Sequence, residues 1–384
     1  MKIKVIKFTI ITIFLLSFAY VNKDKIPMPK ELKTLEFIIT GGVDIDRKTS
    51  DKNNMFSISY IGSEGSANEA DKSNENKHIF NVKSDTMNKT VEKLRDLTNK
   101  SINDSHLKYM LIGEETAKNS LEYFIDYYSK NSNIRLDVYT FITKDMTSEE
   151  FIKKILTSQI DVNARLDGFV NDKTKISSMT KKNLKDIMQI FYTKEKTGLL
   201  PVISIKENPV TNAVDNEKNE NQYTFEFFGL GIIKNGKLID YMPYSLVKPY
   251  LILTKSLKMT DIEIKDEKNN LYVYTIKNSN TQTIFKFDKS DIPKKVIFNI
   301  NLETELIESS SKEKSDKNNK LQSEKIKEEV EEVIKLTKKT NADFLNIGEI
   351  LSIRYPYKWH TIKNDWQNIF ENIEYEINVS VKGR

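Results

Sequence analysis

The sequence predicts an α+β fold of two to three mixed domains, with largely antiparallel sheets flanked by helices, behind an N-terminal export segment. Apolar residues recur with a helical period in some segments and with a period of two in others. The 384 residues exceed what one ordinary core holds. Between the periodic segments lie polar stretches whose few apolar residues cannot offset the entropy of ordering them.

The first 22 residues are typical of an export signal. Three lysines precede an uncharged, mostly apolar run at 8–21, near whose end lie Ser17 and Ala19. Because this run is shorter than a comfortable bilayer span, two alternatives stay open: a cleaved signal peptide, or a signal anchor that remains. In both cases we expect the rest of the chain outside the membrane.

Composition excludes several classes of function. The 60 basic and 55 acidic residues are interleaved and leave a formal net charge of +5. This pattern favours a solvated surface and gives no dedicated nucleic-acid-binding face. The sequence has no cysteine, so disulfides, thiolate nucleophiles and zinc–thiolate sites are excluded. A lipid anchor attached to a cysteine is excluded as well.

Three polar stretches divide the exported part into predicted domains. They lie at 63–77, 212–222 and 308–320. We predict that all three are mobile loops or linkers and that the middle one is the main boundary. The predicted division is an N-terminal α+β domain at 30–205, a linker at 206–222 and a C-terminal α+β domain at 223–384, with two subdomains as an alternative for the last.

The first half begins with strands and an amphipathic helix. Strands are predicted at 37–39 and 55–61, and Gly41 and Gly42 between them suit a turn or a tight backbone approach. A helix follows, with Asp85 or Thr86 as its N-cap. Its predicted apolar face consists of Met87, Val91, Leu94 and Thr98.

The periodicity next predicts a strand–helix–strand unit. The strand at 106–113, the helix at 117–128 and the strand at 136–143 have the spacing of a βαβ unit. The inward face of the helix is predicted to hold Leu121, Phe124, Ile125 and Tyr128. Thr147 and Glu150 form a capping box for a helix at 149–158. A further helix is predicted at 181–192, with Leu184, Ile187, Met188 and Phe191 on one side, ending before Gly198 and Pro201.

In the second half the period changes to two. Strands at 225–233 and 237–241 flank Asn235-Gly236, the pair best suited to a type I′ hairpin turn. Half-buried antiparallel strands are predicted at 262–264, 272–276 and 296–302. A helix is predicted at 323–339, with an apolar stripe of Ile326, Val330, Val333, Ile334 and Thr337. A short helix before Pro356, an aromatic turn and a strand at 373–381 close the chain.

The aromatic turn supplies the candidate site residues, Tyr355, Tyr357, Trp359 and Trp366. Two interpretations stay open for them. They form a core under the last strand, or they form an exposed partner interface, since aromatic side chains concentrate in interface cores.

No catalytic, cofactor or metal constellation is predicted. His78, His106 and His360 lack the short spacing of metal ligands, and no serine or cysteine motif accompanies His106. Asp44 and Asp46 follow two glycines, but they lack EF-hand spacing, so we expect a solvated turn. The Gly229/Gly231 pair lacks the context of a phosphate-binding loop.

Several segments, in order, resemble the Ger(x)C family, the C subunits of nutrient-germinant receptors in spore-forming bacteria. The most specific is 342–349 (ADFLNIGE), followed by 355–359 (YPYKW), Trp366, Phe370 and the last strand. A second match is 105–108 (SHLK) leading into 111–115 (LIGEE), with 134–136 (IRL) beyond it. Weaker matches lie at 42–46, 196–201 and 228–231.

The resemblance implies a non-enzymatic, exported subunit at the outer face of the inner spore membrane. It would be assembled with A-type and B-type receptor subunits that sense nutrients and start germination, without a cofactor and without a small-molecule ligand of its own. Members of the family are usually lipoproteins, but the segment 15–20 (LLSFAY) offers no cysteine. Anchoring therefore requires a retained signal or the partner subunits.

Two other classes of function stay open. A stand-alone extracytoplasmic solute-binding protein would bind a nutrient without partners. An enzyme acting on cell wall fits the chain length and the predicted export, but no motif in the sequence points to it.

Overall fold

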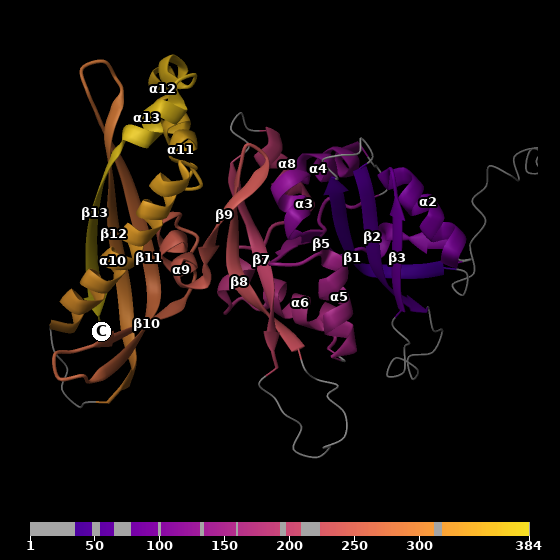
Figure 1. Cartoon of the computed structure of the whole chain (residues 1–384). Coiled ribbons are helices and arrows are strands. Elements are labelled where there is room, and N and C mark those ends of the chain that lie inside the picture. The colour runs from indigo at the N-terminus through magenta and orange to yellow at the C-terminus, as the bar shows by residue number, and fades with distance from the viewer. Residues whose placement is uncertain are drawn as a thin grey trace, which may run out of the picture.

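The computed structural model describes residues 35–47, 54–64, 78–98, 101–130, 134–158, 160–192, 197–208, 223–310 and 317–383. Within them the chain forms two β-sheets with helices packed on both, which confirms the predicted α+β class (Figure 1). The predicted export segment at 1–22 and most of the predicted linker at 206–222 lie outside the described residues, whereas residues 206 and 207 end a strand. Among the described helices, none has the length and apolar character needed to cross a bilayer.

The larger sheet has nine strands in the order β3-β2-β1-β5-β6-β7-β8-β9, with β4 paired to β1 beside this path. Parallel pairs join β1, β5, β6 and β7, and antiparallel pairs join the strands on both sides of them. The bounds are β1 (Leu35–Arg47), β2 (Asn54–Glu64), β3 (His78–Ser84), β4 (Ser101–Asn103), β5 (Tyr109–Gly113), β6 (Tyr139–Thr143), β7 (Gly198–Glu207), β8 (Tyr223–Lys234) and β9 (Lys237–Pro243).

Helices cover both faces of this sheet (Figure 1). They are α2 (Met87–Thr98), α3 (Glu114–Asn119), α4 (Leu121–Lys130), α5 (Ser148–Thr157), α6 (Val162–Asn171), α7 (Ile176–Met179) and α8 (Leu184–Tyr192), with a 3-10 helix at Asp104–His106. Alternate residues of β5 belong to two hydrophobic cores. Tyr109 and Leu111 belong to the core that includes α5 and α6, whereas Met110 and Ile112 belong to the core that includes α2, α4 and α8. A strand buried on both faces is typical of the parallel centre of a sheet.

The predicted strand–helix–strand unit is confirmed, with shorter strands than expected. β5 and β6 pair in parallel, and the connection between them is two helices, α3 and α4. All four side chains predicted to face inward from 117–128 are buried. The capping box of Thr147 and Glu150 is present at the start of α5. Thr86 rather than Asp85 accepts a backbone hydrogen bond at the start of α2, from the Lys89 amide at 3.2 Å.

The glycines at 41 and 42 lie inside β1, so the predicted turn there is wrong and the tight backbone approach is right. A Cβ on Gly41 would lie 2.8 Å from the Tyr60 ring, and one on Gly42 would lie 2.5 Å from Ser148 Oγ. Gly198 and Pro201 belong to β7, a strand that the helix-stopping interpretation missed. Among the helices on the larger sheet, α6 and α7 were not predicted.

The smaller sheet has the order β10-β11-β12-β13. Its strands are β10 (Thr260–Lys265), β11 (Leu271–Phe287), β12 (Pro293–Ser309) and β13 (Glu374–Gly383). The predicted antiparallel pairing of the first three is confirmed, and the terminal β13 pairs in parallel with β12. The associated helices are α9 (Tyr244–Leu253), α10 (Lys317–Thr340), α11 (Ile347–Arg354), α12 (Pro356–Ile362) and α13 (Trp366–Asn372).

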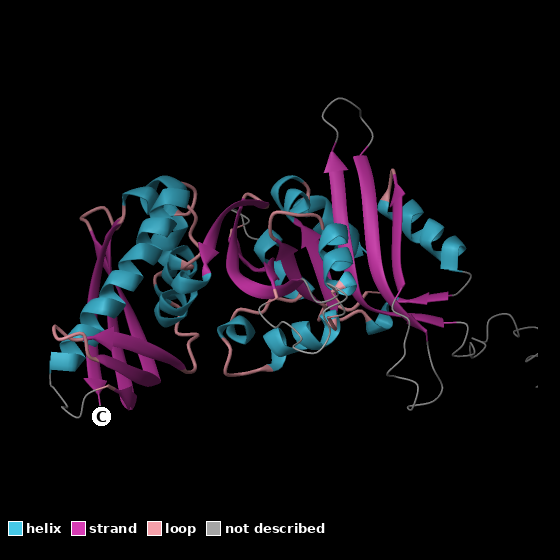
Figure 2. Ribbon diagram, turned by 60° about the horizontal axis from the view of Figure 1, so that its bottom comes forward, coloured by secondary structure: helices cyan, strands magenta, loops and turns pink. Residues whose placement is uncertain are grey.

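Helix α10 lies across one face of this sheet (Figure 2). The predicted apolar stripe is confirmed, since all five of its residues from Ile326 to Thr337 are buried. The helix begins at Lys317, so 317–320 is helical although the sequence predicts a loop there. Asn318 explains part of this difference, because its amide donates to the Tyr274 hydroxyl at 3.0 Å and its side chain is buried under the helix.

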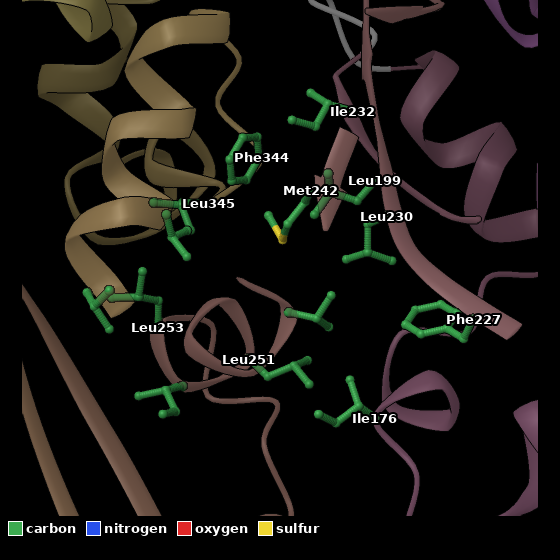
Figure 3. Close-up of a cluster of buried hydrophobic side chains, with 14 of the residues drawn as sticks. Ile176, Leu199, Phe227, Leu230, Ile232, Met242, Leu251, Leu253, Phe344 and Leu345 are labelled. Carbon is green, nitrogen blue, oxygen red and sulfur yellow. The ribbon is translucent and has the colours of Figure 1, made fainter. Parts of the chain in front are cut away.

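Buried side chains join the two sheets through one hydrophobic cluster (Figure 3). Met242, Leu251 and Leu253 come from β9 and α9, and Phe344 and Leu345 come from the segment between α10 and α11. Because close-packed interiors resist deformation, this junction holds the two parts as one body.

The hairpin predicted after the polar linker is confirmed, with φ of 51° at Asn235 and 72° at Gly236. Its strands β8 and β9 follow the predicted boundary at 206–222 but extend the sheet that precedes it, through the pairing of β7 with β8. The division of the chain into domains at 30–205 and 223–384 therefore stays a prediction.

Candidate functional site

The candidate aromatic residues lie at one end of the smaller sheet, on helices rather than in the predicted turn. Tyr355 precedes α12, Tyr357 and Trp359 lie on α12, and Trp366 begins α13. The turn is wrong because Pro356 suits the first position of a helix as well as a turn.

Asp343 organises this region. Its carboxylate accepts backbone hydrogen bonds from Ile347 at 2.8 Å and Gly348 at 2.7 Å, two amides that α11 itself leaves without partners. It also accepts the indole Nε1–H of Trp366 at 3.2 Å. The motif at 342–349 therefore has a physical meaning: its aspartate caps a helix and fixes an indole ring.

Gly348 completes this arrangement because it leaves room for both indoles. A Cβ there would lie 2.8 Å from Nε1 of Trp366 and 3.1 Å from Cη2 of Trp359. The two rings meet edge to face, with centroids 5.2 Å apart. Asn346, in the left-handed conformation with φ of 57°, directs the chain into α11.

A second aromatic contact fixes α12 on the hairpin of β11 and β12. The Tyr355 ring lies 5.0 Å from the Phe287 ring and 5.9 Å from the Phe285 ring, between centroids. Lys358 lies 4.0 Å above the Phe287 ring and pairs with Asp291 at 2.6 Å. Helix α12 is thus held against the 288–292 turn (Figure 1).

The four candidate residues differ in exposure. Trp366 is 3% exposed and belongs to the core, and Tyr355 and Trp359 are half-buried. Tyr357 is 89% exposed, and Ile353 near it, which sequence reasoning missed, is 72% exposed. The structure therefore places one candidate on the surface and three in or against the core, while the interface prediction itself stays a prediction.

Asp44 does not lie in a solvated turn, which corrects that prediction. It is in β1, and its carboxylate accepts the Ser148 amide at 2.9 Å, the Ser148 hydroxyl at 2.7 Å and the Glu149 amide at 3.1 Å. Burial raises the pKa of Asp44, although these hydrogen bonds act in the opposite direction. With the Thr147 cap, Asp44 supplies acceptors for the first turn of α5. Asp46 continues the ladder opposite Met55.

A crevice of 860 Å³ opens beside Asp44, where the parallel strands β1, β5 and β6 end. Glu114 lines it, accepts the Asp145 amide and pairs with Lys118 at 2.6 Å. Burial opposes ionisation of Glu114, but the hydrogen bonds that its carboxylate accepts, from Lys118 first and then from the Asp145 amide, act together with the Lys118 charge to lower the pKa. The carboxylates of Asp44 and Glu114 are thus engaged by the protein's own amides and side chains, so they serve the fold.

The three histidines do not converge. His78 begins β3, His106 ends a 3-10 helix and His360 lies on α12. Within the described ranges, no group of three His, Asp or Glu side chains is arranged to hold a metal ion.

Near His106, sequence reasoning missed a polar cluster around Asp167 of α6. Lys108 and Tyr109 both donate to its carboxylate, and Asn171 donates at 3.0 Å. Burial opposes ionisation of Asp167, but these hydrogen bonds lower its pKa. The motif at 105–108 therefore ties β5 to α6.

The two sheets, their packed junction and an aromatic cluster that leaves Tyr357 exposed define an α+β protein. Residues 29–205 match the family described as spore germination protein N-terminal domain, and 228–384 match spore germination B3/GerAC like, C-terminal. The chain therefore belongs to the Ger(x)C family of spore germination proteins.

A solved structure gives the same fold. The crystal structure of the GerBC protein superimposes with a TM-score of 0.54 at 16% identity, covering 89% of this chain and 97% of that one. No curated protein matches the chain.

Proposed function

We propose that this protein is a non-enzymatic C-type subunit of a spore germinant receptor. It scaffolds or relays nutrient sensing at the outer face of the inner spore membrane, beside A-type and B-type subunits. The observation that carries the proposal is the match to both family domains, which together span most of the chain after residue 28.

The packed junction favours this role over a stand-alone solute-binding protein. Hinged binding proteins close two domains around a ligand, and such closure needs an interface that opens. Here Met242, Leu251 and Phe344 fill the junction and are at most 2% exposed. A rigid body of this kind is suited to docking against partners.

The contact region we propose consists of Tyr355, Tyr357, Trp359 and Trp366, with Tyr357 as the contacting side chain. Trp366, Trp359 and Tyr355 hold α12 in place, and Tyr357 presents its ring to the membrane-embedded complex. A mutation at Tyr357 removes no core contact, so it separates docking from folding.

Co-expression with A-type and B-type subunits tests the assignment. We expect the tagged chain to retain both subunits after detergent extraction, and the purified chain alone to give no heat when titrated with amino acids and sugars. Tyr357→Glu should weaken retention in the membrane fraction, whereas Tyr192→Glu, at a tyrosine that is 82% exposed on α8, should not. Nutrient binding by the isolated chain, or turnover of peptidoglycan, would replace this proposal by one of the other two functions.

A further inference from the structure

The end of the molecule that carries Tyr357 combines exposed apolar side chains with a cluster of cations. Ile353 and Tyr357 lie four residues apart and expose 72% and 89% of their surfaces. Few large apolar residues of the described chain are as exposed as these two. They lie at the α11–α12 connection, beside the turn between β11 and β12 (Figure 1).

Lysines and arginine surround this pair. The segments 284–294 and 350–365 contain six basic residues against three aspartates and no glutamate. The basic residues are Lys286, Lys289, Lys294, Arg354, Lys358 and Lys363. Lys286, Lys289 and Lys363 are exposed, and Lys294, which pairs with Asp288 at 3.9 Å, has 69% of its side chain exposed. The surface as a whole is therefore positive.

The surface is also rigid. Arg354 donates to the Thr283 carbonyl at 2.5 Å, and Lys358 pairs with Asp291 at 2.6 Å, so the end of α11 and the first turn of α12 are tied to the β11–β12 hairpin. Tyr357 and the cations are thus presented by elements that are tied to one another, and little backbone entropy is lost when they bind.

This combination has a defined physical complement. Tyrosine prefers the boundary between water and lipid, where its ring is in an apolar layer and its hydroxyl stays hydrated. Lysine and arginine extend their charged ends to phosphate, and each contributes to binding near an anionic lipid surface. A zwitterionic surface lacks the negative potential that would attract the cations that this surface holds in excess over its aspartates.

We infer that the tip formed by 284–294 and 350–365 docks on anionic phospholipid, with Tyr357 and Ile353 in the headgroup layer and the lysines against the phosphates. This inference rests on the membrane location included in the proposed function, and it places Tyr357 against the lipid that surrounds the receptor subunits rather than against a subunit. It gives the chain a contact with the bilayer that requires no cysteine-linked lipid.

The two tryptophans provide a local measurement. The sequence has only two: Trp359 lies at this tip, and Trp366 packs against Trp359 with ring centroids 5.2 Å apart. Fluorescence of the full chain therefore reports on the tip alone, whatever other segments bind vesicles. We would mix the chain with vesicles of equal parts phosphatidylglycerol and phosphatidylcholine carrying brominated acyl chains, which quench nearby indoles. Brominated phosphatidylcholine alone is the reference.

We expect quenching by the anionic vesicles only, weakened by salt. Tyr357→Glu should abolish it. Lys286→Glu with Lys289→Glu should lower vesicle affinity by at least about 25-fold, because each lost cation contributes about five-fold and each new carboxylate is repelled by the anionic lipid. Tyr192→Glu, and Lys173→Glu with Lys185→Glu in the N-terminal part, are matched controls and should change nothing. Unchanged thermal melts show that every variant is folded.

Two outcomes overturn the inference. Quenching that is absent, or that survives both tip variants, means that the tip does not meet lipid. If quenching is absent while Tyr357→Glu still releases the chain from the receptor complex, the surface meets a protein subunit and the proposed function stands. If the complex itself does not form, the proposed function fails independently of the vesicle result.

Discussion

Replacing Gly348 by alanine tests how closely the two indole rings pack over the start of α11. The new Cβ would lie 2.8 Å and 2.9 Å from Nε1 and Cε2 of Trp366, and 3.1 Å from Cη2 of Trp359. Trp366 is 3% exposed and its Nε1 is bonded to Asp343, so the ring cannot move without breaking contacts. Overpacking of this kind costs about 1–3 kcal/mol.

A competing effect has the opposite sign. Glycine is less favourable than alanine inside a helix by about 1 kcal/mol, and Gly348 lies in the first turn of α11, where the gain is smaller. We therefore expect a net loss of about 1–2 kcal/mol in the free energy of unfolding. Gly168 of α6 is the matched control, because a Cβ there meets only Lys175 Nζ at 3.6 Å. Gly168→Ala should stabilise the protein by about 0.5–1 kcal/mol.

Urea unfolding followed by tryptophan emission and by far-ultraviolet circular dichroism measures both variants. The emission of the folded Gly348→Ala variant should also shift, since the rings lose their packing. If Gly348→Ala is as stable as the wild type with an unchanged emission spectrum, the indoles do not pack on this glycine as described.

Three further variants test other contacts. Asp343→Ala removes the acceptor for two amides and one indole, so the free energy of unfolding should fall by about 1–3 kcal/mol and the tryptophan emission should shift to the red. An unchanged melt would contradict the capping role of Asp343. Phe344→Ala should cost about 3–5 kcal/mol, because it opens a cavity at the junction, and a loss below 1 kcal/mol in urea unfolding would mean that the junction is not tightly packed. Burial raises the pKa of Asp44 above 3.8, so protonation of this carboxyl favours the folded state. The free energy of unfolding of the wild type, relative to that of Asp44→Asn, should therefore be highest below pH 3.8. It should fall as the pH rises through the raised pKa. Thermal melts over this pH range would contradict the prediction if the stability of the wild type relative to Asp44→Asn increased with pH.

Local patterns in the sequence were enough to predict the elements that depend on neighbours. The Asn235-Gly236 turn, the Thr147 capping box and the stripe from Ile326 to Thr337 are all confirmed, because each depends on residues within a few positions of one another. The same holds for the inward face of α4.

Contacts between distant segments could not be predicted in this way. Asp44 caps a helix 104 residues further on, and a glycine-aspartate run has the same local signal whether it turns or pairs. At the candidate site, the aromatic composition did not decide whether these side chains are buried in the core or exposed on the surface. Only the fold shows that Trp366 reaches back to Asp343 and that Tyr357 is exposed.

The pairing of β7 with β8 has a practical consequence for dissecting this protein. A fragment that stops at residue 205 would lose two strands of its own sheet and would leave the hydrogen-bonding edge of β7 bare, next to Leu200 and Val202. Bare edges of this kind recruit other chains and aggregate. The complementary fragment would carry the β8–β9 hairpin without its β7 partner, which leaves a second unpaired strand edge. Truncation, limited proteolysis and domain exchange should therefore keep residues 198–243 together, because strands from the second half of the sequence complete the sheet of the first half.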